Sequence, residues 1–143
     1  MIHAQDARII TNYFYSEGIM ARGWKNFRGD ELINKTIDGL AEAMIELAEE
    51  TGARADRIVP HDEGWLQGSK FIDSDPANPL IVKIGYGGGG SSGHPVVPYA
   101  VRWHEEEANF QKNRRNKYLA DPLKEVAGTA NNHIKNKMAK VWK

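Results

Sequence analysis

The sequence predicts an α+β fold in two layers, with a long N-terminal helix and a C-terminal helix packed on an antiparallel sheet of three to four strands. Three observations predict it: an apolar stripe at helical spacing in the first half, two-residue alternation in the middle, and a second helical stripe at the end. A chain of 143 residues fits one domain. We expect an N-terminal arm over residues 1–29 and a single domain over residues 30–143.

The N-terminal arm carries a run of β-branched and aromatic residues, Ile9 to Tyr15, that predicts a strand. Such a strand pairs either within its own subunit or with a neighbouring one, and the sequence leaves both arrangements open. Asp6 and Arg8 stand where a signal peptide needs an apolar core, so we expect no standard secretion signal. No stretch approaches the ~20 apolar residues of a membrane span, so we expect a soluble protein with no membrane contact.

The strongest helical signal runs from Glu31 to about Ile58. Asp30 is its predicted N-cap, because the carboxylate can accept hydrogen bonds from the free N–H groups of the first turn. Gly39 and Gly52 each weaken a helix by roughly 1 kcal/mol relative to alanine, yet we expect one long helix. The apolar stripe, at spacings of three and four, consists of Ile33, Ile37, Leu40, Met44, Leu47, Thr51, Ala55 and Ile58.

The middle of the chain predicts antiparallel strands. Residues 65–73 form the first, which a turn with two prolines at residues 75–79 ends. Residues 80–86 and 99–103 alternate with a period of two and form the next strands. Between them lies a loop that we expect to order only against another surface, made of Gly87, Gly88, Gly89, Gly90, Ser91, Ser92 and Gly93. This loop lacks the Gly-Lys-Ser/Thr ending of a phosphate-binding P-loop.

A polar, basic loop follows over residues 108–117, and a second helix begins at Asp121 and Pro122, the predicted N-cap and first helical residue. The loop residues Arg114, Arg115 and Lys117 are candidates for contact with DNA or with an acidic partner. Lys+Arg and Asp+Glu both number 19, so the net charge is zero, whereas proteins that grip phosphates usually carry a basic excess. The balance favours solvated charge or a protein contact.

Few residues form a pattern that predicts catalysis. The chain has no cysteine, which excludes disulfides, a thiolate nucleophile and cysteine-based zinc sites. His61, Asp62 and Ser69 lie too close together in one loop for the usual geometry of a catalytic triad. His104 precedes three glutamates but has no second histidine four residues away, as a helical zinc site needs. We therefore expect no catalytic, metal or cofactor site.

Three segments together resemble the tail-completion proteins of tailed phages, which are minor capsid or neck proteins of the head–tail connector. Residues 59–69 resemble the family's Val-Pro-x-Asp-(Thr)-Gly-x-Leu-x-x-Ser motif, with Glu63 where threonine is usual. Residues 98–105 resemble its Tyr-Ala-x-x-x-His/Phe-Glu strand, and residues 117–123 resemble the entry to its last helix. The motif positions are Pro60, Asp62, Gly64, Leu66, Ser69, Tyr99, Ala100, His104, Glu105 and Leu119.

The resemblance implies a structural virion protein, not an enzyme, at the phage neck after assembly in the host cytoplasm. It implies a homo-oligomeric ring, a hexamer or alternatively a dodecamer, between the head connector, adaptor or stopper protein and the tail terminator or tail tube protein. Phage DNA would pass through the ring without sequence-specific binding. The glycine-rich loop and the terminal arms would dock on the neighbours.

Three other functions stay open on the sequence. A tail terminator or a head-closure protein has a similar architecture. A small metal-dependent hydrolase would use His104, Glu105 and Glu106. A DNA-binding module would use the basic loop and the C-terminal helix.

Overall fold

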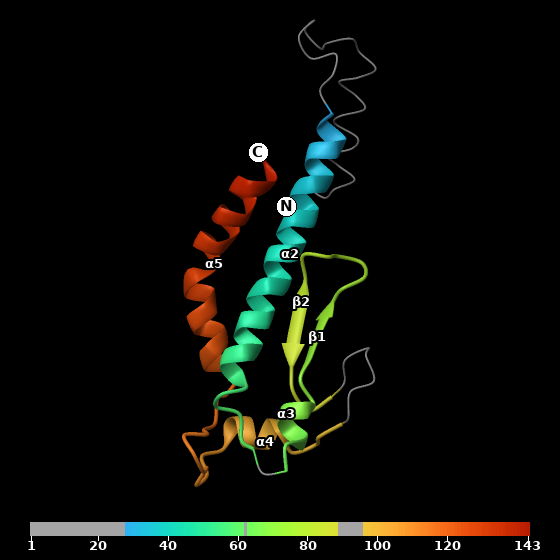
Figure 1. Ribbon diagram of the computed structural model, residues 1–143. Helices are drawn as coiled ribbons and strands as arrows, with labels where there is room; N and C mark the ends of the chain where they lie inside the picture. Colours follow the sequence, from blue (N-terminus) through green and yellow to red (C-terminus); the bar gives the residue numbers. More distant parts are fainter. Residues whose placement is uncertain (1–27, 62, 89–95) are drawn as a thin grey trace, which may run out of the picture.

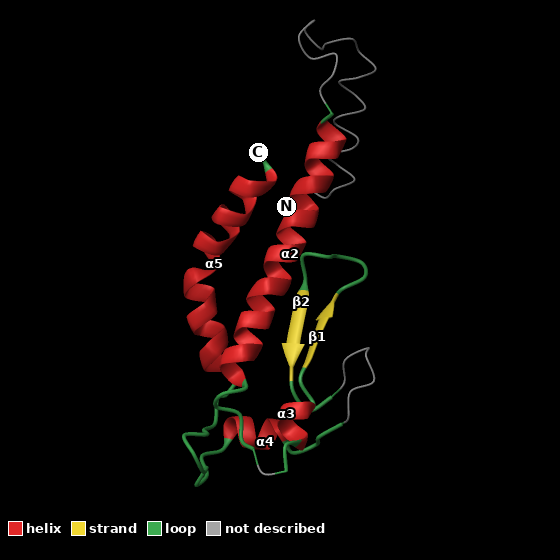
Figure 2. Cartoon of the chain, in the orientation of Figure 1, coloured by secondary structure: helices red, strands yellow, loops and turns green. Residues whose placement is uncertain are grey.

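The computed structural model describes residues 28–61, 63–88 and 96–143, and the fold within them is α+β, as predicted (Figures 1 and 2). The predicted strand in the N-terminal arm lies outside the described residues, as do Asp62 and the loop residues Gly89, Gly90, Ser91, Ser92 and Gly93. The elements, in chain order, are α2 (Gly29–Ala55), α3 (Trp65–Gly68), β1 (Phe71–Ser74), β2 (Val82–Gly85), α4 (Ala100–Glu105) and α5 (Ala120–Val141).

Helix α2 is the central element of this arrangement (Figure 1). Helix α5 packs along one side of it, and the hairpin of β1 and β2 packs on another. Short helices α3 and α4 lie near each other beyond its C-terminal end. The prediction of two layers, with both long helices on one face of the sheet, is therefore wrong: α5 packs mainly on α2.

Helix α2 has 27 residues, which makes it about 40 Å long. The predicted N-cap is wrong: Arg28 is the N-cap, and Asp30 lies in the first turn, where an acid still complements the helix dipole. The helix continues through Gly52 and ends at Ala55, three residues before the predicted end. A Cβ at Gly52 would lie 3.2 Å from Ile84 of β2, so this glycine lets the hairpin pack closely.

The two long helices approach closely at Gly39, where an added Cβ would lie 2.7 Å from both Met138 and Val141 of α5. Nearby, the Glu46 carboxylate accepts hydrogen bonds from His133 and Lys137, both at 2.7 Å. The hydrogen bond from Lys137 is the main cause that holds the pKa of Glu46 below its ordinary value of 4.5. Charged contacts thus join two segments far apart in the sequence.

Replacing Glu46 with glutamine should make the α2–α5 contact less sensitive to acid. Folding lowers the pKa of the Glu46 carboxyl below 4.5. The ionised carboxylate therefore contributes its full stabilisation of the folded state above about pH 4.5, and this contribution is lost as the pH falls through the lowered pKa of the folded state. The site is partly exposed, so we expect Glu46→Gln to lower the free energy of unfolding by at most about 1 kcal/mol at pH 7 and by less at pH 3. Urea unfolding at both pH values measures this, with Glu107→Gln, at an exposed position away from both long helices, as the control. An equal loss at both would contradict it.

The predicted three to four strands are also wrong, because the described residues contain only two. These pair antiparallel, with Ile72 opposite Ile84. Residues 65–68 form helix α3 instead of the start of a strand, since Gly64 adopts a left-handed φ of +84° at the N-cap. The second strand is confirmed over Val82–Gly85, and side-chain oxygens of Asp75 and Asn78 accept backbone N–H bonds in the turn before it.

The predicted strand at residues 99–103 is helix α4. Its alternating residues also fit a short helix: Ala100 is buried, while Val101 is 73% exposed. The ring of His104, one turn after Ala100, packs edge-on against Tyr118 at 5.0 Å. Tertiary packing therefore selects the helix.

The C-terminal helix is confirmed, but its start differs from the prediction. Leu119 is the N-cap of α5, and Asp121 and Pro122 lie inside its first turn. The loop over residues 108–117 is confirmed as irregular, with positive φ angles at Lys112 and Asn113. The start of α5 thus differs from the prediction by only two residues.

Candidate functional site

The segments that carry the three motifs meet beyond the C-terminal end of α2. We call this packed and hydrogen-bonded region the motif junction. Its buried core combines residues from the first motif, the second motif and the start of the third. The core residues are Val59, Leu66, Val97, Ala100 and Tyr118. Segments up to about 60 residues apart in the sequence thus form one structural unit.

Ser69 ties α3 to the start of the glycine-rich loop. Its side chain is fully buried, and the hydroxyl donates to the carbonyl of Leu66 at 2.6 Å. The same oxygen accepts the backbone N–H of Gly87 at 2.8 Å. The hydroxyl therefore lies within a backbone network. His61, which the sequence places near it, is exposed.

Replacing Ser69 with alanine should destabilise the motif junction. The partly buried N–H of Gly87 would lose its acceptor, which costs about 1 kcal/mol. Urea unfolding measures the loss, and amide hydrogen exchange should show faster exchange at Gly87. Ser74→Ala is the matched control, because Ser74 is exposed on β1. Equal stability of the two variants would contradict the role of Ser69.

Tyr118 connects the second motif to the third. It is 2% exposed, and its hydroxyl donates to the carbonyl of Ala100 at 2.7 Å. Burial raises the pKa of Tyr118 to about 12. Its ring meets that of Tyr86 edge-on at 5.4 Å, and the Tyr86 hydroxyl donates to Asp56 at 2.7 Å. Burial first, and then this bond to Asp56, raise the pKa of Tyr86 above its ordinary value.

His104 joins α4 to the N-terminus of α5. Its Nε2 lies 3.3 Å from the backbone N–H of Ala120 and accepts it, so Nδ1 carries the proton and donates to Glu105 at 2.6 Å. Lys117 forms an ion pair with the same glutamate and is the main cause that lowers the pKa of Glu105. Both ring nitrogens of His104 thus have partners within the fold.

The residues of the metal-hydrolase alternative do not gather around one point. Glu106 pairs with Arg102 at 2.8 Å, while Glu105 faces Lys117. Across the described ranges, no group of three or more His, Cys, Asp or Glu residues is arranged to hold a metal ion. His104 and Glu105 do contact each other, at 2.6 Å between Nδ1 and Oε1.

All three basic loop residues predicted to contact DNA or an acidic partner form contacts within the chain, Lys117 through its ion pair with Glu105. The Arg114 guanidinium donates to the carbonyls of Asp56 and Val59, at 2.6 and 3.0 Å. These carbonyls follow the C-terminus of α2, where a cation complements the helix dipole. Arg115 pairs with Asp121 at 2.7 Å but stays half exposed. Sequence reasoning missed the role of Arg114, because its partners lie 55 or more positions away.

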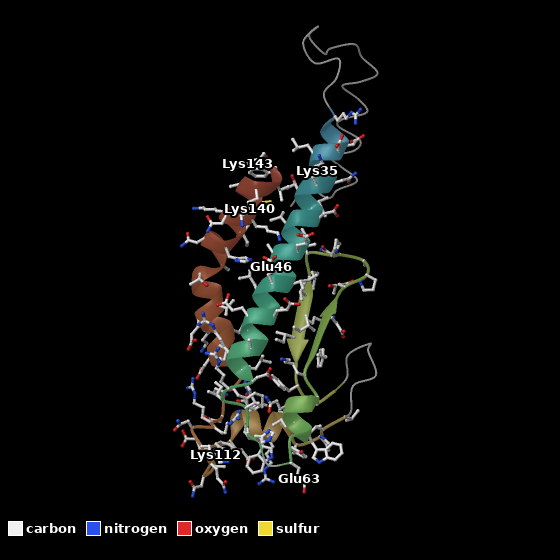
Figure 3. The ribbon with its side chains drawn as sticks, in the orientation of Figure 1. Lys35, Glu46, Glu63, Lys112, Lys140 and Lys143 are labelled. Atoms are coloured by element: carbon white, nitrogen blue, oxygen red, sulfur yellow. The ribbon has the colours of Figure 1, made fainter. Side chains whose placement is uncertain are left out.

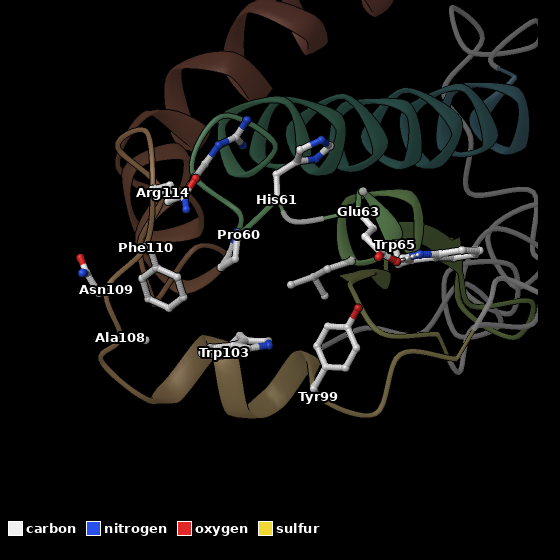
Figure 4. A pocket seen from close by; sticks show the side chains of 13 residues that line it. Pro60, His61, Glu63, Trp65, Tyr99, Trp103, Ala108, Asn109, Phe110 and Arg114 are labelled. Carbon is white, nitrogen blue, oxygen red and sulfur yellow. Dashed lines mark hydrogen bonds between the residues drawn. The ribbon is translucent and has the colours of Figure 1, made fainter.

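A groove of about 600 Å³ opens beside the motif junction (Figure 4). Motif residues Pro60, Leu66 and Tyr99 line it, together with Trp103 and Phe110. Phe110, isolated in the sequence, packs edge-on against Trp103 at 5.7 Å between ring centres. At the mouth, the exposed indole of Trp65 donates to Glu63 at 2.9 Å. The sequence signal that could have found this groove is the recurrence of aromatic residues in and after the second motif, namely Tyr99, Trp103 and Phe110.

Comparison of the chain with protein-family models, with curated proteins and with solved structures finds no match. Within the described parts of the chain, no helix has both the length and the hydrophobicity that crossing a bilayer requires. The sequence motifs and the geometry of the motif junction are therefore the features that bear on the function of this chain.

Proposed function

We propose that this chain is a structural protein of the phage head–tail connector, of the tail-completion or neck type, and that it acts as a homo-oligomeric ring. The observation that supports this most is the meeting of all three family-like segments in one motif junction. Val59 and Leu66 of the first segment share a buried core with Ala100 and Tyr118. Tyr118 also bonds to Ala100, and His104 bonds to Ala120. A common structural role for the three segments, to build one packed unit, explains why they come together in the fold.

The chemistry of the motif junction favours a mechanical role. The side chains that could act in catalysis, Ser69, His104 and Tyr118, each form hydrogen bonds that hold the backbone in place. A rigid junction fixes the direction of α2 relative to α4 and α5. Beside it, Trp65 and Tyr99 expose 60% and 41% of their surface, and large aromatic residues are frequent anchors of protein interfaces.

In this proposal the chain has no catalytic step: its function is to bind neighbouring copies of itself and form a ring. Each subunit contacts the next through two different surfaces, and rotation closes the ring around the DNA channel. The exposed aromatic groove offers a surface for the adjoining connector or tail protein. The ring joins head to tail and transmits DNA without reading its sequence.

The assembly state of the purified chain tests the proposal. Mass photometry and negative-stain electron microscopy should show closed rings near six times the 16.0 kDa mass of the chain, or twelve times for the alternative. A metal-stimulated cleavage of DNA or peptide substrates that is lost in His104→Ala would contradict the proposal. So would a chain that stays monomeric from micromolar to millimolar concentration.

A further inference from the structure

The two long helices carry charge of opposite sign. Helix α2 contains seven acidic and two basic residues, whereas α5 contains four lysines and two acids. Some of these charges pair within the chain, as Lys137 does with Glu42 and Glu46 (Figure 3 labels Glu46). The acidic charge of α2 and the basic charge of α5 therefore neutralise each other where the two helices are in contact. The remaining charges lie on the helix faces that point away from this contact.

Four exposed residues define these outer faces: Asp38 and Glu49 on α2, and Lys124 and Lys135 on α5. Within the described residues, none of the four takes part in an ion pair. Glu42 lies between the two acids along α2, and its side chain is 66% exposed despite its contact with Lys137. We call these surfaces the acidic face of α2 and the basic face of α5.

The charges on the two faces have the same spacing. Asp38 and Glu49 lie eleven residues apart, and so do Lys124 and Lys135. Eleven residues make three helical turns, so each pair points in one direction and spans about 16 Å. Two helices that lie side by side can therefore bring both acids next to both lysines at once.

The basic face of α5 also allows close approach of another helix. The residues between the two lysines on this face are small or short, namely Ala127, Gly128 and Asn131, and all three are exposed. A Cβ added at Gly128 would meet no atom within 4 Å. The face is thus open, and no long side chain of its own keeps a partner away.

We propose that the basic face of α5 in one copy of the chain docks on the acidic face of α2 in the next copy. This inference rests on the proposed homo-oligomer and names its subunit contact. The two faces lie on different helices, so each copy can use both at once, as a ring requires. Single exposed ion pairs contribute little, but complementary charge selects the partner and its orientation.

Charge reversal on one face at a time tests this contact. The acid-reversed variant is Asp38→Lys with Glu49→Lys, and the base-reversed variant is Lys124→Glu with Lys135→Glu. Each variant alone should associate at least tenfold more weakly than the wild type in 50 mM salt. An equimolar mixture of the two should regain association, because each then presents the charge that the other lacks. Analytical ultracentrifugation measures the assembly, and circular dichroism checks that each variant folds.

Matched controls carry the same change of net charge elsewhere. These are Glu106→Lys with Glu107→Lys, and Lys83→Glu with Lys112→Glu, all at exposed positions. They should associate as the wild type does. If the wild type and both reversed variants form equal rings, the contact is wrong and the proposed function stands. If the wild type is monomeric at every salt concentration, both proposals fall.

Discussion

The variant Gly87→Ala is expected to lose about 3 kcal/mol or more of the free energy of unfolding. Gly87 has a φ of +96°, which costs other residues roughly 1–3 kcal/mol. An added Cβ would also lie 2.6 Å from the Cβ of Ala100 and 3.1 Å from the carbonyl oxygen of Val97. Because Gly87 and Val97 are joined by a backbone hydrogen bond of 2.8 Å, neither side can move apart freely. Urea unfolding followed by tryptophan fluorescence measures the loss.

Gly68→Ala is the matched control for this variant. A Cβ at Gly68, the last residue of α3, would meet nothing within 4 Å, and its φ is not in the left-handed region. We expect the stability of this control to stay within about 0.5 kcal/mol of the wild type. Equal stability of the two glycine variants would refute the close approach of Gly87 to Ala100 of α4.

The variant Tyr118→Ala is expected to have the second large effect, a loss of about 3–5 kcal/mol. Tyr118 is buried in the motif junction, and removing its ring would leave a cavity between Tyr86 and His104. Tyr118→Phe keeps the ring and removes only the bond to the carbonyl of Ala100, so we expect a loss of about 1–2 kcal/mol.

The informative result is which of the two variants, Tyr118→Ala or Tyr118→Phe, loses more of the free energy of unfolding. If Tyr118→Phe costs as much as Tyr118→Ala, the hydroxyl and not the packing of the ring holds the motif junction together. If neither variant changes the midpoint of urea unfolding, Tyr118 is not a core residue. Tyr99→Phe, at a tyrosine of the groove wall that is 41% exposed, is the control and should unfold as the wild type does.

Both long helices could be predicted from the sequence because their signals are local. In α2, Leu47, Thr51 and Ala55 recur at a helical spacing and are all buried. Strand β2 was equally clear, since Val82 and Ile84 alternate with the exposed Lys83. Helix ends were less predictable, because an acid near a helix start stabilises it both at the N-cap and within the first turn.

Helix α4 could not be predicted, because its six residues fit two periods. Tyr99, Val101 and Trp103 alternate as in a strand, while Ala100 and His104 lie one helical turn apart. The choice depends on contacts of these residues with distant segments, which no local pattern contains. The same applies to Arg114, whose carbonyl partners at the end of α2 are known only from the fold.

The candidate site was predictable in its residues but not in its geometry. The motif positions Leu66, Ser69 and Ala100 were identified from the sequence, and all three are buried in or beside the motif junction. The groove beside them was missed, because its walls come from two segments far apart in the sequence, with Pro60 and Leu66 on one and Trp103 and Phe110 on the other.

The position of the chain in assembled particles tests the central claim most directly. Particles from a lysate of cells that carry the gene would be labelled with gold-linked antibodies against the purified chain and imaged by electron microscopy. The proposal predicts label at one point on each particle, where the head joins the tail. Label spread over the head or along the tail, or particles that lack the chain altogether, would contradict it.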